Sequence, residues 1–117
     1  MQNILLIVNA SPYGNERCLS ALRLTLALAS HGQPSRIKLF LLSDAVITAQ
    51  NGQGNSNGPS LADMLTEAMT HGVAVHVCRT CAEARGLDQT RLLPGVKIGS
   101  MPELADWTLE ADKVVSF

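Results

Sequence analysis

The distribution of apolar residues along the chain alternates between two patterns. In one, apolar residues follow one another with little interruption, which is typical of strands buried on both faces of a parallel sheet. In the other, apolar residues recur every three or four positions, which is typical of amphipathic helices. The first pattern predicts five strands, at residues 3–10, 36–44, 73–77, 95–99 and 112–117.

Capping residues mark where the intervening helices begin. Ser60 with Asp63, and Ser100 with Glu103, have the spacing of capping boxes. A loop rich in glycine, asparagine and serine occupies residues 50–60. Helices are expected at residues 15–31, at residues 60–72, within residues 83–94 and from residue 100 onward.

Strands that alternate with helices favour parallel pairing through right-handed crossovers. Residues 1–117 show no internal repeat or linker, and their number suits one modest core. We therefore predict an α/β fold, namely a single-domain, three-layer α/β/α sandwich around a mostly parallel sheet of about five strands. The order of the strands within the sheet is left open.

Charge and aromatic content argue against a nucleic-acid partner, and the length of the apolar runs argues against a membrane partner. Nine basic and ten acidic residues give a net charge of −1, and aromatic residues make up only 3% of the chain, so no nucleic-acid partner is expected. No apolar run approaches the roughly 18 residues of a membrane span, and the first strand lacks the features of a signal peptide. We expect no membrane partner, a cytoplasmic location and reduced cysteines.

The apolar content favours self-association. Apolar residues make up 46% of the chain and charged residues only 16%. A chain of this size has a small interior relative to its surface, so one core cannot hide all of its apolar side chains. We therefore expect a homo-oligomer.

The segment VCRTCAEARG places two cysteines three residues apart, directly after the third predicted strand. Ligands bind at the carboxyl ends of the strands in open parallel sheets, which puts Cys78 at a rim where sites form. A helical turn after Cys78, with Arg79 and Arg85 nearby, would favour its thiolate. Cys78 is the candidate reactive centre, and Cys81 is a candidate for resolving a sulfenate or persulfide formed on it. The alternative is that both cysteines only pack.

Other uses of the cysteine pair have less support. A structural zinc site needs four ligands and one CxxC supplies two, so no metal is expected. Thioredoxin-like proteins carry the motif after an early strand, with glycine and proline between the cysteines, unlike the arrangement here. No Walker loop or GxGxxG is present, and no cofactor is expected. His76 is a candidate base for Cys78, with a packing role as the alternative.

Loops that follow the first and second strands are predicted to reach the same rim. Tyr13 and Asp44 are therefore candidate pocket residues, together with Arg79 and Arg85. Alternatively, Tyr13 is a subunit contact and Asp44 a helix cap. The loop at residues 52–58 is interpreted as a solvated connection, with a lid over the site as the alternative.

Four stretches lie in order along the chain: ASPYGNE, LFLLSDAV, VCRTCAEARGL and GVKIGSMPELADWTLEADKVVSF. Together they resemble the DsrE/DsrF-like family, in particular its YchN-like branch. The resemblance covers essentially the whole chain. It implies a compact α/β/α fold that assembles as trimers or hexamers.

The resemblance also implies a role for the cysteines. In the sulfur-relay members of the family, such as DsrE and TusD, a cysteine after the third strand accepts sulfane sulfur as a persulfide and passes it on. Cys78 matches that cysteine, and Cys81 matches the second cysteine of the YchN-like branch. This implies a sulfur carrier or sulfurtransferase that works with donor and acceptor proteins. A ligand-binding or regulatory oligomer without catalysis, and a thiol–disulfide oxidoreductase, are the alternatives.

Overall fold

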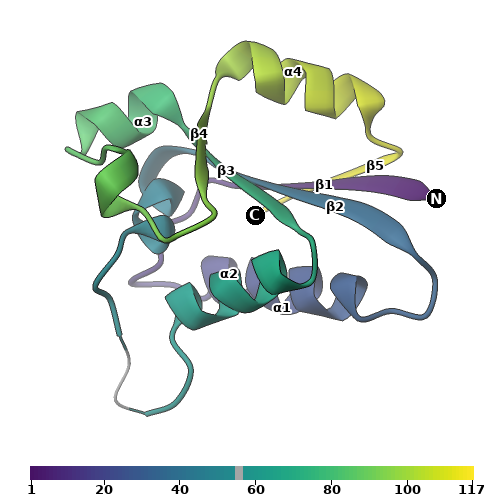
Figure 1. The fold of residues 1–117 in the computed structure, drawn as a ribbon, viewed down its shortest axis with the longest axis horizontal. Coiled ribbons are helices and arrows are strands. Elements are labelled where there is room, and N and C mark those ends of the chain that lie inside the picture. The colour runs from purple at the N-terminus through teal and green to yellow at the C-terminus, as the bar shows by residue number, and fades with distance from the viewer. Residues whose placement is uncertain (55–56) are drawn as a thin grey trace.

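The fold is built on one sheet, described by a computed structural model that covers residues 1–54 and 57–117. Its five strands run parallel throughout, in the order β4-β3-β2-β1-β5. Successive strands therefore lie beside one another from β1 to β4, and the last strand returns to the free edge of β1 (Figure 1). The strands are β1 (Gln2–Val8), β2 (Ser35–Leu41), β3 (Ala74–Cys78), β4 (Lys97–Gly99) and β5 (Lys113–Ser116).

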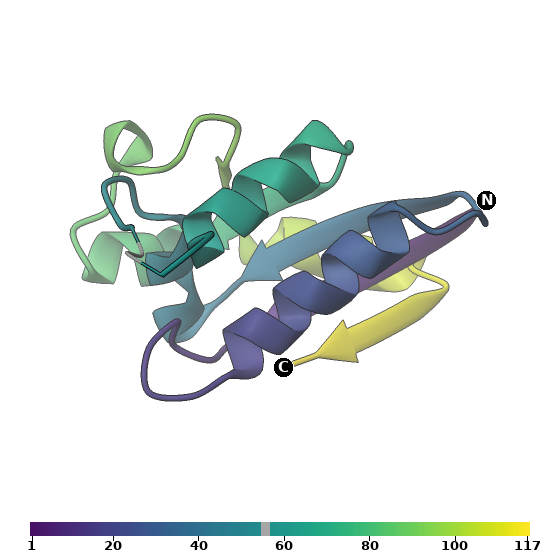
Figure 2. The ribbon, with the colours of Figure 1, turned by 90° about the horizontal axis from the view of Figure 1, so that it is seen from below.

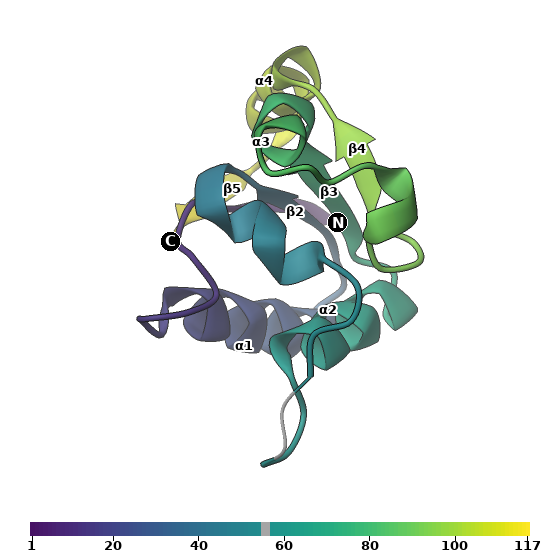
Figure 3. The same ribbon diagram turned by 90° about the vertical axis from the view of Figure 1, so that its left-hand side faces the viewer.

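Helices form a layer on each side of this sheet, which confirms the predicted three-layer α/β/α sandwich. The helices α1 and α2 lie side by side on one face (Figure 2), and α4 lies on the other (Figures 1 and 3). None of the helices in the described part of the chain is both long and apolar enough to cross a membrane. The α-helices are α1 (Arg17–Ala29), α2 (Leu61–Thr70), α3 (Arg79–Ala84) and α4 (Met101–Glu110), and the 3-10 helices are η1 (Ser43–Ala49) and η2 (Gln89–Arg91).

The core is divided unequally between the two faces of the sheet, because successive strand residues point to opposite sides. Leu6, Leu39 and Val75 face α1 and α2 and belong to the larger cluster. The α4 face has a much smaller cluster, made of Leu5, Phe40, Cys78 and Leu104. Cys78 therefore lies on the sparsely covered side of the sheet.

The second strand is shorter than predicted. The expected strand at residues 36–44 ends at Leu41, and the 3-10 helix η1 begins at Ser43. The apolar run continues across this boundary because Ala45, Val46 and Ala49 are also buried. A continuous apolar run does not by itself distinguish a buried strand from a buried helix, so the sequence did not show the change.

The structure confirms the predicted capping box at Ser60 and the predicted cap at Ser100, but the second capping box is incomplete. Ser60 and Asp63 form the predicted capping box, with both reciprocal hydrogen bonds present. Ser100 caps α4 by accepting a hydrogen bond from the Glu103 N–H at 3.3 Å. The other hydrogen bond of this capping box, from the Ser100 N–H to the Glu103 carboxylate, was predicted wrongly, since that carboxylate binds His76 instead.

Candidate functional site

The two cysteines of the CxxC motif lie where β3 ends and α3 begins. Cys78 is the last residue of β3 and the N-cap residue of α3, and it is only 4% exposed. Cys81 follows in the first turn of the helix and is half-buried. The helix starts directly behind Cys78, as predicted, and ends at Ala84, so it overlaps the expected range of 83–94 only at residues 83 and 84.

Hydrogen bonds make Cys78 the more acidic thiol of the pair. Burial acts to raise its pKa, because a thiolate is poorly solvated inside a protein. The N–H groups of Cys81 and Thr80, the Cys81 thiol and the Thr80 hydroxyl all donate toward its sulfur and act in the opposite direction. Their combined effect prevails, and the pKa of Cys78 lies below its ordinary value. The site therefore favours the thiolate of Cys78.

Cys81 is shifted in the other direction. Burial raises the pKa of Cys81, and its hydrogen bond to Cys78 and the neighbouring negative charge raise it further. The Ser43 N–H and the Arg85 guanidinium lower the pKa of Cys81 without reversing the shift. Of the two thiols, Cys78 therefore loses its proton more readily, and Cys81 retains its proton and donates a hydrogen bond to the Cys78 sulfur.

An ion pair joins the segments that follow β2 and β3. Arg85 Nη2 lies 2.8 Å from Asp44 Oδ1, and Arg85 Nη1 donates to the Cys81 carbonyl at 3.0 Å. Ser43, next to Asp44, has a φ of 52°, which is uncommon for a residue other than glycine. The structure therefore brings together Asp44, Cys81 and Arg85, three of the residues singled out in the sequence.

The other two candidate pocket residues lie apart from this contact. Arg79 is exposed at the start of α3. Tyr13 is 63% exposed, donates a hydrogen bond to the Gln53 side chain, and lines a 240 Å³ cavity whose lining includes neither Cys78 nor Cys81. Their roles in the pocket stay predictions. The suggested lid at 52–58 includes residues 55 and 56, which lie outside the described residues.

His76 is occupied by partners on the α4 face of the sheet. Its Nδ1 lies 2.6 Å from Glu103 Oε1, and its ring packs against Trp107 with centroids 4.5 Å apart. Trp107 in turn meets the edge of Phe40 at 5.8 Å. These contacts hold α4 on the sheet beside the cysteine site. Glu103 was not identified from the sequence as a neighbour of the site, because its spacing from Ser100 already accounted for it as a helix-capping residue.

Gly99 makes room for this arrangement. It pairs with Cys78 across β3 and β4, and a Cβ there would collide with Glu103 Oε1 and lie 3.0 Å from Phe40 Cε2. We expect Gly99→Ala to lower the free energy of unfolding by about 1–3 kcal/mol, since Phe40 is fully buried and cannot move freely. Gly32→Ala is the matched control, because its Cβ would meet open space. Equal urea midpoints for the two variants would contradict this account.

Cys18, the third cysteine, belongs to a different environment. Its thiol donates to the Ala10 carbonyl at 3.0 Å and lies 3.4 Å from Thr48 Oγ1. Burial raises the pKa of Cys18, and the Thr48 hydrogen bond lowers it only in part. Within residues 1–54 and 57–117, no group of three His, Cys, Asp or Glu side chains is placed to hold a metal ion.

A family profile matches almost the whole chain. The sequence profile of the DsrE/DsrF-like family aligns with residues 2–117. The chain belongs to the DsrE/DsrF-like family. Protein YchN of Escherichia coli K12 is 41% identical over 117 residues, covering the full length of both chains. Sulfurtransferase TusD of Pectobacterium carotovorum is 28% identical over 131 aligned positions, again covering both chains completely.

Solved structures agree with this family assignment. The crystal structure of the Escherichia coli ychN protein superposes with a TM-score of 0.94, at 41% identity and full coverage of both chains. A protein of unknown function from Methanobacterium thermoautotrophicum has a TM-score of 0.82 at 18% identity, also at full coverage. The second match concerns the fold alone. The predicted family and fold are both confirmed.

Proposed function

We propose that this DsrE/DsrF-like protein carries sulfane sulfur as a persulfide on Cys78. The observation that carries the proposal is the asymmetry of the cysteine pair, in which hydrogen bonds lower the pKa of Cys78 and its neighbour Cys81 remains a thiol. A thiolate is the form that attacks a sulfur donor. The similarity to a protein named sulfurtransferase TusD supports the same chemistry.

Loading and delivery are two thiolate attacks on a persulfide. The Cys78 thiolate attacks the outer sulfur of a donor R–S–SH, giving Cys78–S–SH and releasing R–S⁻. An acceptor thiolate then attacks the outer sulfur on Cys78, takes it as its own persulfide and leaves Cys78 as a thiolate. Neither step needs an oxidant, a metal or a cofactor. Donor and acceptor proteins are the partners that this cycle requires.

Cys81 gives the site a second way to release sulfur. Its sulfur can attack the inner sulfur of Cys78–S–SH, which forms the Cys78–Cys81 disulfide and releases hydrosulfide. The raised pKa of Cys81 keeps it protonated and so slows this attack. We therefore propose that Cys81 leaves the persulfide intact while it is protonated and discharges it once it is deprotonated.

Intact mass spectrometry tests the proposal directly. After incubation with a low-molecular-weight persulfide, the chain should gain about 32 Da, the mass of one sulfur atom. The gain should disappear after treatment with a reducing thiol. A chain that gains no mass under these conditions is not a sulfur carrier.

A thiol–disulfide oxidoreductase is the second candidate, because Cys81 lies in the first turn of the helix that Cys78 caps and its thiol donates toward the Cys78 sulfur. It predicts a reversible disulfide with a measurable potential and equal loss of activity on replacing either cysteine. The sulfur carrier predicts unequal effects, since only Cys78 holds the sulfur. A slow thiol in alkylation kinetics would favour a ligand-binding or regulatory oligomer without catalysis.

We also propose that a second copy of the chain covers α4, in a trimer or hexamer. Met101, Ala105 and Leu109 follow one another at intervals of four and form an apolar stripe along one side of this helix, the α4 stripe. Met101 is 54% and Leu109 is 86% exposed. Val114 on the neighbouring edge strand β5 is 45% exposed and extends the apolar surface. Exposed apolar side chains at helical spacing are typical of helix–helix contacts between subunits.

We expect Leu109→Asp to reduce the molar mass of the assembly, because a buried carboxylate without a partner is costly. Multi-angle light scattering measures the change, and the expected product is a monomer or a smaller oligomer. Thr66→Asp is the matched control, since Thr66 is exposed on α2, on the opposite face of the sheet. The same molar mass for both variants would show that the α4 stripe lies outside the interface.

A further inference from the structure

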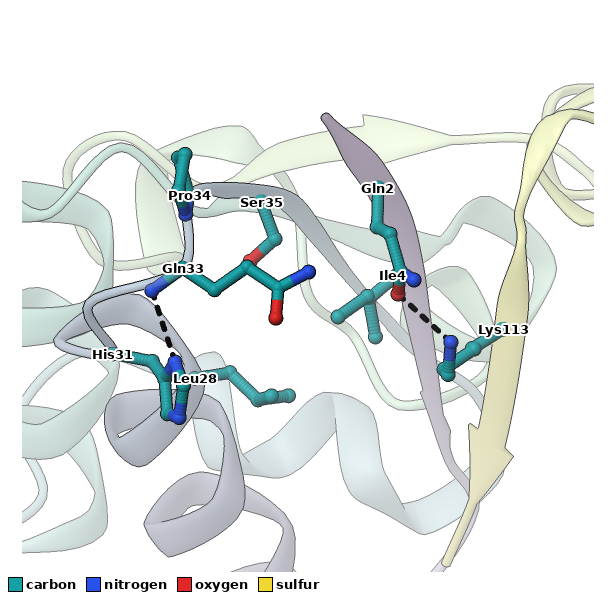
Figure 4. Close-up of a pocket in the computed structure, with 8 residues that line it drawn as sticks. All are labelled: Gln2, Ile4, Leu28, His31, Gln33, Pro34, Ser35 and Lys113. Atoms are coloured by element: carbon teal, nitrogen blue, oxygen red, sulfur yellow. Dashed lines mark hydrogen bonds between the residues drawn. The ribbon is translucent and has the colours of Figure 1, made fainter.

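A cavity of 270 Å³ lies at the opposite end of the sheet from the cysteines. It is formed where β1, β2 and β5 begin and where α1 ends (Figure 4). We call it the amino-end cavity. Its lining residues are Gln2, Ile4, Leu28, His31, Gln33, Pro34, Ser35 and Lys113.

The topology of the sheet explains why this space is open. The helix α1 packs against β1 and β2, whereas β5 lies on the far side of β1 at the edge of the sheet. Lys113, the first residue of β5, pairs with Ile4 across the two strands. The side of β5 that faces the α1 layer therefore has less cover than β1 and β2, and Lys113 forms one wall of the cavity.

Lys113 supplies a positive charge without a neutralising partner. Its Nζ donates to Gln2 Oε1 at 2.8 Å, which is an amide oxygen. Among the residues that the structure describes, no carboxylate forms an ion pair with Lys113, and the cavity lining contains no Asp or Glu. The adjacent Asp112 carboxylate accepts a hydrogen bond from the Asn3 N–H instead. The cavity therefore offers a cation to a ligand.

Neutral hydrogen-bond donors face the same space. The Gln33 N–H donates to His31 Nδ1 at 3.0 Å, so the ring carries its proton on Nε2 and presents a donor there. The Gln33 carboxamide reaches toward the middle of the cavity (Figure 4). The Gln2 amide has N–H groups that remain after its oxygen accepts from Lys113. Carboxamides can also accept hydrogen bonds, so it is the Lys113 ammonium beside these donors that favours an anion.

The remaining wall is apolar. The Leu28 side chain extends into the cavity from the last turn of α1, and Ile4 lies between it and Gln2 in the same view (Figure 4). A ligand that bridges both walls needs an anionic end and an aliphatic end. The volume is slightly below the range of about 300–1,000 Å³ that is typical of drug-sized pockets, so the ligand is small.

We propose that the amino-end cavity binds a small carboxylic acid with a short aliphatic chain. Its carboxylate pairs with Lys113 and accepts from the Gln2 amide. Its chain lies against Leu28 and Ile4. The site is separate from the cysteine pair, and it does not depend on whether sulfur is carried on Cys78.

A comparison of two isosteric probes tests the role of charge. Hexanoate is titrated into the ¹⁵N-labelled full chain, and hexanamide serves as the uncharged counterpart. We expect hexanoate to shift the amide signals of Gln2, Leu28 and Lys113, with saturation at millimolar probe, and hexanamide to bind roughly tenfold more weakly. Absence of hexanoate binding, equal binding of both probes, or shifts confined to other parts of the chain would each overturn the proposal.

Substitution of the lysine provides the second arm of the experiment. Lys113→Gln should weaken hexanoate binding roughly tenfold, whereas Lys113→Arg should retain most of it, because the charge is kept. Lys97→Gln is the matched control, since Lys97 is exposed on β4, at the other edge of the sheet. The thermal midpoint of each variant shows that it is folded. Unchanged affinity in folded Lys113→Gln would overturn the assignment.

Discussion

Replacing Cys78 by serine is expected to remove the sulfur adduct completely while leaving the chain folded. The serine hydroxyl fits the volume of the thiol and can accept the same hydrogen bonds from Thr80 and Cys81. It cannot form a persulfide, because the outer sulfur must bond to a sulfur atom. The measurement is the intact mass after incubation with a persulfide donor, with circular dichroism as the check on folding.

Two variants make this result specific to Cys78. Cys81→Ser should still gain the mass of one sulfur and should keep it longer, because attack by the second thiol is no longer available. Cys18→Ser should load as the wild type does, since Cys18 is buried and hydrogen-bonded away from the pair. A full adduct on Cys78→Ser would place the sulfur on another cysteine and end the present assignment.

Removing the hydrogen bond from Cys81 is expected to slow the reaction of Cys78 with iodoacetamide. The Cys81 thiol is one of the donors that lower the pKa of Cys78. Cys81→Ala removes this donor, so the pKa of Cys78 rises and less thiolate is present at neutral pH. We expect alkylation there to be roughly five- to tenfold slower. Cys81→Ser keeps a hydroxyl donor and should react nearly as fast as the wild-type Cys78.

The sign of the pH dependence separates the two variants. Alkylation follows the thiolate fraction, which grows as pH rises and levels off above the pKa. A lowered pKa therefore moves the midpoint of the rate profile to lower pH, and Cys81→Ala should move it back to higher pH than Cys81→Ser. Both variants are made in a Cys18→Ala background, so that Cys78 is the single thiol. Superimposed profiles would show that Cys81 does not act on Cys78.

Much of the fold was predictable because every central strand is buried on both faces. A strand such as β1, with Leu5 and Leu6 buried on opposite sides, must be apolar at successive positions, and that run is visible in the sequence. Capping signals at Ser60 and Ser100 added the starts of two helices. The strand order was not predictable, because the return of β5 to β1 depends on contacts between the two ends of the chain.

The site was predictable in position but not in detail. Cys78 was expected at the end of a strand and before a helix, and it lies there. The Arg85–Asp44 ion pair and the Ser43 contact with Cys81 depend on how η1 turns after β2, and the continuous apolar run concealed that turn. His76 is bound to Glu103 through tertiary packing, which the spacing of two residues from Cys78 did not reveal.

The position of β5 also determines when the sheet can be completed as the chain is synthesised. Its backbone pairs with β1, so residues 113–116 meet the strand at residues 2–8 only after all the residues between the two strands have left the ribosome. At about 5–20 residues per second, the first strand waits roughly ten seconds for this partner. During that time one edge of β1 is unpaired and open to other strands, including those of neighbouring nascent chains. Completion of the sheet is therefore a late event that depends on the last of the five strands to be synthesised, which covers this edge of β1.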